Sequence, residues 1–137
     1  MPKKKIRISL ISAQFHEDIV ERMIHEATEE LKKMSGVLST ITRVTGCFEI
    51  PLAVKRVMLK KTIDAVVVLG FIEKGETLHG EVMGHVVYQA LMDIQLEYMK
   101  PIGFGIIGPG ASEKQARVRM VGTARHAVQA AFSQYQT

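Results

Sequence analysis

The fold is decided first by one stretch, Ala65-Val66-Val67-Val68-Leu69, in which no side chain is polar. A strand that is apolar on both faces is typical of a parallel sheet covered by helices on each side. The stretch is followed by the polar turn Gly75-Glu76-Thr77-Leu78-His79-Gly80-Glu81 and by a long helical pattern. The sequence therefore predicts a buried strand that passes through this turn into a helix starting near Glu81.

The same alternation of strand and helix extends in both directions from this stretch. Apolar periodicity predicts strands over residues 6–11, 38–44, 65–69 and 102–107, and helices over 17–34, 51–60, 81–98 and 112–133. Gly36 is expected to end the first helix, and Ser112 with Gln115 has the spacing of a capping box. A chain of 137 residues suits one domain. We expect a single α/β domain over residues 1–137, with an open four-stranded parallel sheet flanked by helices and residues 38–44 at its edge.

Ligands of open parallel sheets bind beyond the carboxyl ends of the strands. Here those ends are Gln14-Phe15-His16 and residues 45–49, 71–79 and 108–111, all expected to be loops. We expect the four loops to converge on one rim.

Composition excludes several classes of partner. The net charge is +4, its only run is Lys3-Lys4-Lys5, and aromatic residues make up 6% of the chain, so a solvated tail fits better than a nucleic-acid interface. The single cysteine, Cys47, excludes an internal disulfide and suggests a reducing compartment. No apolar stretch is long enough for a signal sequence or a membrane span. We therefore expect a cytoplasmic protein without a membrane or nucleic-acid partner.

The turn at residues 75–81 can be interpreted as an enzyme site or as a plain connection. The first turn of a helix has unpaired N–H groups that suit an anion such as phosphate. His79 adds a side chain that titrates near neutrality. Together they predict a phosphate cradle beside a proton carrier.

Three residues at the other strand ends have two interpretations each. Phe15 is a stacking platform for a planar ligand or a plug of the core. Cys47 is a nucleophile or, more simply, a small buried residue in a tight turn. Glu49 precedes Pro51 at a helix start, where the helix dipole favours a carboxylate, and it could also bind a polyhydroxyl ligand.

Two further patterns do not support a cofactor or a metal. Residues 103–108 match G-x-G-x-x-G but lie inside the last strand, so their small residues are expected to allow another backbone or a ligand to approach closely. His79 and His85 would not share one helix face, so no metal site is predicted from them. His25, His85 and His126 are expected at the surface, and His16 has no assigned role.

At this point the chain resembles the 6,7-dimethyl-8-ribityllumazine synthase family. The characteristic motifs of the family occur in the same order in this chain: Ser12-Ala13-Gln14-Phe15, Gly46-Cys47-Phe48-Glu49-Ile50-Pro51 and Gly75-Glu76-Thr77-Leu78-His79, then Phe104-Gly105 and Arg119. The resemblance covers about residues 6–131, and Gly108-Pro109-Gly110 is similar to archaeal members in particular.

The resemblance implies a flavodoxin-like three-layer sandwich that assembles as a homopentamer or as a larger icosahedral shell of pentamers. It implies that two small molecules, 5-amino-6-(D-ribitylamino)uracil and 3,4-dihydroxy-2-butanone 4-phosphate, condense to the lumazine, phosphate and water without a cofactor. His79 would be the catalytic acid and base. By the same resemblance, Phe15, Cys47, Phe48, Glu49, Ile72 and Phe104 would bind substrate, and Gly75, Glu76, Thr77 and Arg119 the phosphate, with Phe104 and Arg119 coming from the adjacent subunit.

The chain departs from the family pattern at several positions. The family usually has Asn where this chain has His16 and Pro where it has Leu78, and an aromatic residue or Asp often follows the histidine. A late lysine that contacts phosphate has no clear counterpart, and Arg125 is the nearest candidate. Two other functions stay open: an archaeal-type riboflavin synthase, and a non-catalytic shell protein that binds flavin or lumazine.

Overall fold

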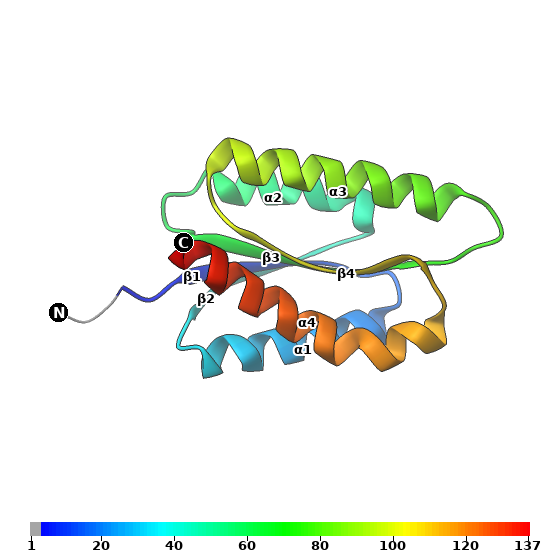
Figure 1. Cartoon of the computed structure of the whole chain (residues 1–137), viewed down its shortest axis with the longest axis horizontal. Helices are drawn as coiled ribbons and strands as arrows, with labels where there is room; N and C mark the ends of the chain where they lie inside the picture. Colours follow the sequence, from blue (N-terminus) through cyan, green and yellow to red (C-terminus); the bar gives the residue numbers. More distant parts are fainter. Residues whose placement is uncertain (1–3) are drawn as a thin grey trace.

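The protein, in a computed structural model that describes residues 4–137, is a parallel sheet covered by helices on both faces. Its elements in that range are β1 (Arg7–Ala13), α1 (Glu17–Lys33), β2 (Val37–Val44), the 3-10 turn η1 (Cys47–Glu49), α2 (Ile50–Met58), β3 (Ala65–Glu73), α3 (His79–Tyr98), β4 (Ile102–Ala111) and α4 (Glu113–Gln136). The sheet order is β2-β1-β3-β4 and every pairing is parallel. Helices α2 and α3 cover one face and α1 and α4 the other (Figure 1). The predicted α/β three-layer sandwich is confirmed.

Strand β3 is the centre of this sheet, as its composition predicted. It pairs with β1 on one side and β4 on the other, and it is buried from Ala65 to Ile72. Val67, Leu69 and Phe71 pack towards α1 and α4, while Val66, Val68 and Ile72 pack towards α2 and α3. The two hydrophobic layers of the protein therefore meet on this one strand. Burial of each such side chain stabilises the fold by about 1.5–3 kcal/mol.

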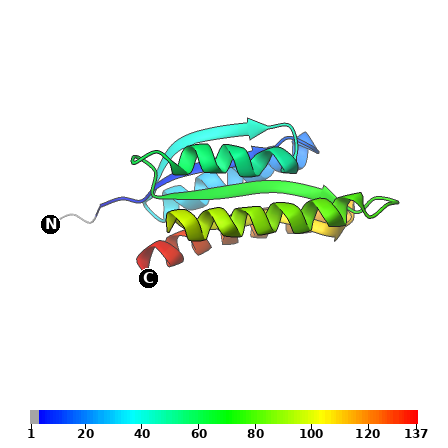
Figure 2. The same cartoon turned by 90° about the horizontal axis from the view of Figure 1, so that it is seen from above.

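The carboxyl ends of the strands lie at one end of the molecule. Figure 2 shows β2 and β3 pointing the same way, with the connections to their following helices at that end. Strand β2 lies at the sheet edge, as predicted, and its polar Thr40 side chain meets Ser9 of β1 at 2.7 Å. Among the described helices, none is both long and apolar enough to cross a membrane.

The prediction that residues 108–111 form a loop is wrong. Strand β4 continues to Ala111, because β3 also continues, to Glu73, and offers backbone groups to pair with. After a register shift Glu73 lies opposite Ala111, and the N–H of Lys74 donates to the Ala111 carbonyl at 2.8 Å. The fourth strand end is therefore part of the sheet.

The helix ends also differ in detail from the predictions. Helix α1 ends at Lys33, and Ser35 rather than Gly36 has the left-handed conformation, with φ 60°. Gly36 is needed for packing instead, since a Cβ there would lie 2.6 Å from the Phe132 ring. Helix α3 begins at His79, two residues earlier than expected. The capping box of Ser112 and Gln115 at the start of α4 is confirmed.

Gly103 and Gly105 of the G-x-G-x-x-G pattern allow α4 to pack closely on the sheet, whereas Gly108 faces Ile72 of β3. A side chain at Gly103 would collide with the backbone carbonyl of Ala127 in α4. The pattern lies inside β4, so the expectation of close backbone approach is confirmed.

Candidate active site

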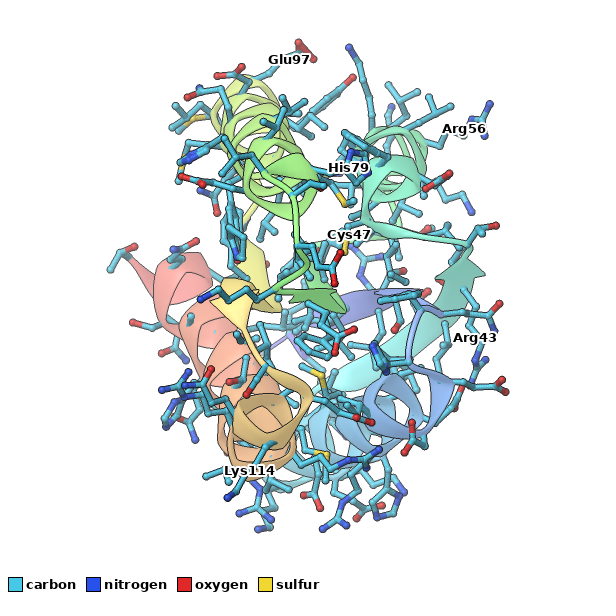
Figure 3. The ribbon with its side chains drawn as sticks, turned by 90° about the vertical axis from the view of Figure 1, so that its right-hand side faces the viewer. Arg43, Cys47, Arg56, His79, Glu97 and Lys114 are labelled. Atoms are coloured by element: carbon cyan, nitrogen blue, oxygen red, sulfur yellow. The ribbon has the colours of Figure 1, made fainter. Side chains whose placement is uncertain are left out.

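A pocket of about 470 Å³ opens at the carboxyl end of the sheet. Figure 3 looks onto this end, where Cys47 and His79 lie close together between the sheet and the layer of α2 and α3. The lining comprises Phe15, Thr45, Gly46, Cys47, Phe71, Ile72, Glu73, Gly75, Thr77, His79, Gly80 and Met83. Three of the four predicted strand ends therefore converge, whereas residues 108–111 do not line this pocket.

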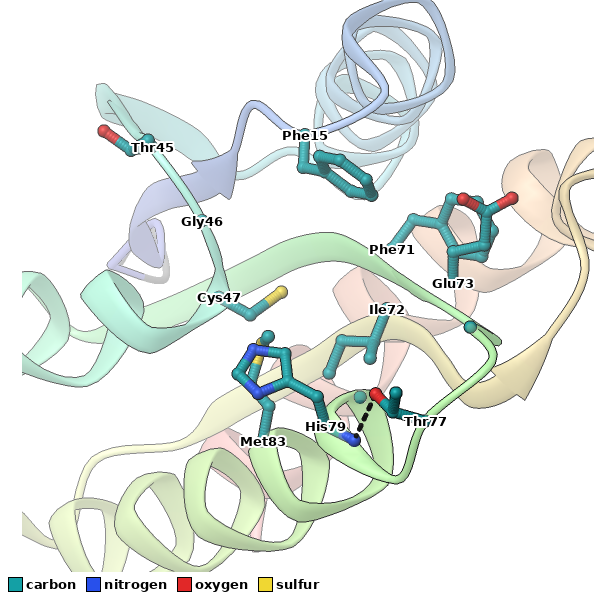
Figure 4. A pocket seen from close by; sticks show the side chains of 12 residues that line it. Phe15, Thr45, Gly46, Cys47, Phe71, Ile72, Glu73, Thr77, His79 and Met83 are labelled. Carbon is teal, nitrogen blue, oxygen red and sulfur yellow. Dashed lines mark hydrogen bonds between the residues drawn. The ribbon is translucent and has the colours of Figure 1, made fainter.

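Phe15 extends into the pocket from the connection between β1 and α1 (Figure 4). The N–H of Gln14 donates to the Val44 carbonyl at 2.8 Å, which ties this connection to the end of β2. The Phe15 side chain is 54% exposed, so it is not a core plug. An exposed aromatic ring at a pocket wall suits the stacking of a flat ligand.

Cys47 forms the wall of the pocket as a buried thiol. It is 4% exposed, and burial, aided by the charge of Glu49, raises the pKa of its thiol to about 12. Because the thiolate is the nucleophilic form, this protonated thiol does not suit nucleophilic catalysis at neutral pH. The interpretation of Cys47 as a small buried residue is the one that the structure supports. Ile72 is buried beside it and also lines the pocket.

Phe48 and Glu49 line a neighbouring groove rather than the pocket itself. The groove runs along the end of β2 and the start of α2, and it shares Thr45 with the pocket. Glu49 is the N-cap residue of α2, and its side chain makes no capping hydrogen bond. An exposed carboxylate here is favoured by the helix dipole and free to accept hydrogen bonds from a ligand.

The turn at residues 75–77 presents unpaired backbone groups. Within residues 4–137, the N–H groups of Gly75, Glu76 and Thr77 donate no hydrogen bond to the protein. The N–H of His79 donates to Thr77 Oγ1 at 3.3 Å and so fixes the turn against the first residue of α3. Unpaired N–H groups at the start of a 20-residue helix are suited to an anion.

His79 lies between this turn and the groove. It lines the pocket, and its ring centroid is 6.0 Å from that of Phe48. His85, one and a half turns further along α3, is exposed and lies 3.8 Å from Glu81, outside the pocket lining. In the part of the chain that the structure describes, no three His, Cys, Asp or Glu residues form a metal-binding group.

Five of the expected site residues do not line the pocket of their own chain. Phe48 and Glu49 line the neighbouring groove, Glu76 lies in the turn before α3, and Phe104 and Arg119 are in neither place. Phe104 is half-buried under α3, with its ring 6.2 Å from that of Tyr88, and Arg119 is exposed on α4. Arg125, the nearest candidate for a second phosphate contact, instead donates hydrogen bonds of 2.9 and 3.2 Å to Glu26 of α1.

Several residues of the lining had no individual role in the sequence analysis. Thr45, Phe71 and Glu73 belong to the strand ends that were expected to converge, whereas Met83 lies outside them. Glu73 could have been recognised as a candidate from the sequence, because it is the first charged residue after the apolar run of β3. His16, which had no assigned role, lies 2.9 Å from the Glu73 carboxylate.

The fold and the pocket define a class of protein, an open parallel α/β sandwich with a small-molecule site at the carboxyl end of its sheet. A sequence model described as 6,7-dimethyl-8-ribityllumazine synthase matches residues 5–137, and the chain belongs to that family. Relatives named 6,7-dimethyl-8-ribityllumazine synthase include one from Saccharolobus islandicus, 38% identical over 99% of this chain and 88% of its own. One from Metallosphaera sedula is 39% identical over 96% and 87% of the two chains. One from Pyrobaculum arsenaticum is 36% identical over 92% and 84%.

Proposed function

We propose that this chain condenses 5-amino-6-(D-ribitylamino)uracil with 3,4-dihydroxy-2-butanone 4-phosphate to form 6,7-dimethyl-8-ribityllumazine, phosphate and water. Family membership over residues 5–137 supports this reaction. One observation supports this assignment most strongly: a single pocket combines the exposed ring of Phe15, the imidazole of His79, and Gly75 and Thr77 of the turn before α3. These features suit a flat heterocycle, proton transfer and a phosphate, which are the needs of this reaction.

The pyrimidine substrate would stack on Phe15, with Ile72 and Cys47 forming the wall beneath it. Its ribityl chain would extend into the neighbouring groove, where Phe48 and the Glu49 carboxylate lie. The Glu49 side chain makes no capping hydrogen bond at the start of α2, and its carboxylate suits a chain of hydroxyl groups, which are donors.

The phosphate of the second substrate would bind at the turn before α3. Gly75, Glu76 and Thr77 would donate their free N–H groups, and the helix dipole would add favourable electrostatics. We assign Arg119 of a neighbouring subunit as the cation that pairs with the phosphate, because Arg119 is exposed and lies outside the pocket of its own chain. Phe104 of that neighbour would close the ring pocket.

The chemistry consists of imine formation between the pyrimidine amine and the ketone, loss of phosphate, and ring closure with loss of water. Each of these steps moves a proton, so His79 would act as general acid and base. The pocket would contribute by holding both reactants side by side, an effect worth up to about 7–11 kcal/mol in favourable cases. No bound cofactor takes part.

We propose a homopentamer as the active assembly, with a larger icosahedral shell of pentamers as the second possibility. The exposed face of α3 is apolar for a surface helix, and its exposed side chains include Val82, Val86, Met92 and Leu96, with Leu78 exposed at its N-cap. A contiguous stripe of this kind is typical of an interface. A neighbour seated there would also explain why Phe104 and Arg119 lie away from their own pocket. The single unpaired cysteine supports a reducing compartment, and we propose the cytoplasm.

One assay tests the reaction directly. The purified protein is mixed with both substrates, and the absorbance and fluorescence of the lumazine are followed. Formation of lumazine is the expected result. Conversion of lumazine alone would instead indicate a riboflavin synthase, and tight binding of flavin without turnover a storage protein. Sedimentation of the same sample measures whether the assembly is a pentamer or a shell.

A further inference from the structure

His16 connects two segments of the site that are far apart in the sequence. It is the N-cap residue of α1 and has a left-handed backbone, with φ 59° and ψ 65°. Its carbonyl accepts hydrogen bonds from the N–H groups of Ile19 and Val20, at 3.0 and 3.1 Å. Its position is therefore fixed by the start of the helix, and its side chain is directed by that fixed backbone.

The His16 ring contacts two aromatic side chains. Its centroid is 4.5 Å from the ring of Phe15, edge to face, and 4.9 Å from the ring of Phe71. Phe71 is 1% exposed, so the imidazole rests on a rigid part of the core. These two contacts limit the rotation of the His16 ring, and the contact with Phe15 also supports that side chain.

His16 Nε2 then lies 2.9 Å from Glu73 Oε1 at the end of β3. An ionised carboxylate only accepts hydrogen bonds, so the Nε2–H group is the donor. The second carboxylate oxygen of Glu73 has no hydrogen-bond partner among residues 4–137. The Glu73 side chain is 36% exposed and belongs to the pocket lining. The second carboxylate oxygen of Glu73 is therefore an oriented hydrogen-bond acceptor at the pocket.

Figure 4 shows Phe15 and Glu73 on the same side of the β3 ribbon, with Cys47 and His79 on the other side. A flat ligand stacked on Phe15 would therefore present its edge near the Glu73 carboxylate. The pyrimidine substrate has ring N–H and amino groups at its edge, which are donors, and a charged acceptor binds donors about twice as strongly as a neutral one.

We propose that Glu73 recognises the N–H groups of the pyrimidine substrate and that His16 is the positioning residue that orients this carboxylate. This assignment rests on the proposed function for the identity of the heterocycle. It adds a charged recognition group for the pyrimidine ring beside the aromatic platform of Phe15.

The test measures the affinity of 5-amino-6-(D-ribitylamino)uracil alone by calorimetry, and KM for each substrate in the assay. We expect Glu73→Gln to weaken pyrimidine binding and raise its KM about tenfold, the loss typical of one charged hydrogen bond. KM for the ketone phosphate and kcat should change by less than about twofold. This pattern is expected when the lost interaction stabilises the bound substrate and the transition state equally. The matched control is Glu21→Gln, because Glu21 also ties α1 to a strand, through Arg43 at 2.7 Å, and is equally exposed at 36%.

Two variants of His16 separate orientation from backbone conformation. His16→Gln keeps an N–H donor of similar reach, whereas His16→Asn is too short to reach Glu73 but tolerates the left-handed backbone better. If His16 acts through Glu73, Gln preserves pyrimidine affinity better than Asn. The proposal would be overturned if His16→Asn bound the pyrimidine more tightly than His16→Gln. It would also be overturned if the wild type and Glu73→Gln bound the pyrimidine equally well. A wild type that binds the pyrimidine but forms no lumazine would instead refute the proposed reaction, and Glu73→Gln would still test the recognition by its binding alone.

Discussion

The ring centroids of His79 and Phe48 lie 6.0 Å apart, and the two ring planes meet at an angle of 64°. The contact joins η1, which follows β2, to the first residue of α3, which follows β3. It brings the imidazole to the junction between the pocket and the neighbouring groove. A proton carrier at this junction can reach both the stacked heterocycle and the turn that is suited to phosphate.

Replacement of this imidazole tests its role in proton transfer. His79→Ala should lower kcat by about 10²–10⁴-fold, the usual contribution of a general acid or base. Turnover should stay measurable, because the pocket would still hold both substrates together. Steady-state kinetics measure the effect, and His25→Ala is the control, since His25 is exposed on α1 outside the pocket. Complete inactivity of an intact assembly would contradict the prediction that holding the two substrates together accelerates the reaction without His79.

The aromatic platform should act on binding of the pyrimidine. Phe15→Ala should weaken it about tenfold, because stacking pairs contribute about 0.5–1.5 kcal/mol beyond their buried area. Calorimetry with the pyrimidine substrate measures the change, and Phe15→Tyr should keep the affinity close to that of the wild type. Unchanged affinity of Phe15→Ala would rule out the stacking role.

Arg119 should act across a subunit boundary. Arg119→Ala should raise KM for the ketone phosphate about ten- to a hundredfold, as expected for a lost hydrogen bond to a charged group. The control is Arg117→Ala two residues away, whose guanidinium is already bound to Asp18 and Glu113. This control should keep KM close to the wild-type value.

Mixed assemblies of two defective variants test the shared site directly. When His79→Ala and Arg119→Ala chains are co-expressed, about a quarter of the sites should combine an intact His79 with an intact Arg119, because a ring of subunits shares its sites between neighbours. The mixture should therefore be more active than either variant alone. No gain in activity in mixed assemblies would show that one chain supplies both residues.

The buried thiol should be unreactive in the folded protein. Because burial raises the pKa of Cys47 to about 12, almost no thiolate forms at pH 8. Iodoacetamide should modify Cys47 only after unfolding in denaturant, which mass spectrometry would detect. Rapid modification of the native protein at pH 8 would show that the thiol is accessible and ionised.

Asp64 should make stability depend on acid pH. Burial raises the pKa of this carboxyl, but hydrogen bonds from the Arg7 side chain and backbone, with the charges of Arg7 and Lys4, outweigh it and lower the pKa below its ordinary value. A lowered folded-state pKa gives stability that is present above the unfolded value of about 3.9 and lost as pH falls through the folded one. Asp64→Asn should therefore cost about 2 kcal/mol of unfolding free energy at pH 7, and less below pH ~4.

Denaturant unfolding at pH 7 and at about pH 3 measures this difference. Glu29→Gln is the control, because Glu29 forms an exposed pair with Lys32 at 3.4 Å, and such pairs contribute little. A cost of Asp64→Asn that is the same at both values of pH would contradict the role of its charge.

Much of the site could be predicted because its residues are local in sequence. The turn at residues 75–77 directly precedes α3, and Phe15 and Cys47 directly follow strands, so their place at the carboxyl end follows from strand direction alone. The route of the last connection could not be predicted. Residues 108–111 have the composition of a loop, and only the length of β3 makes them a strand.

The sequence by itself determined the alternation of strands and helices, the burial of β3 and the order of the site loops, because periodicity and strand composition are properties of neighbouring residues. Only the tertiary structure decided that His16 meets Glu73, 57 residues away, and that Arg125 is bound to Glu26, 99 residues away. Such pairs depend on strand register and helix packing, which fix the distance between distant segments and leave no trace in the local pattern.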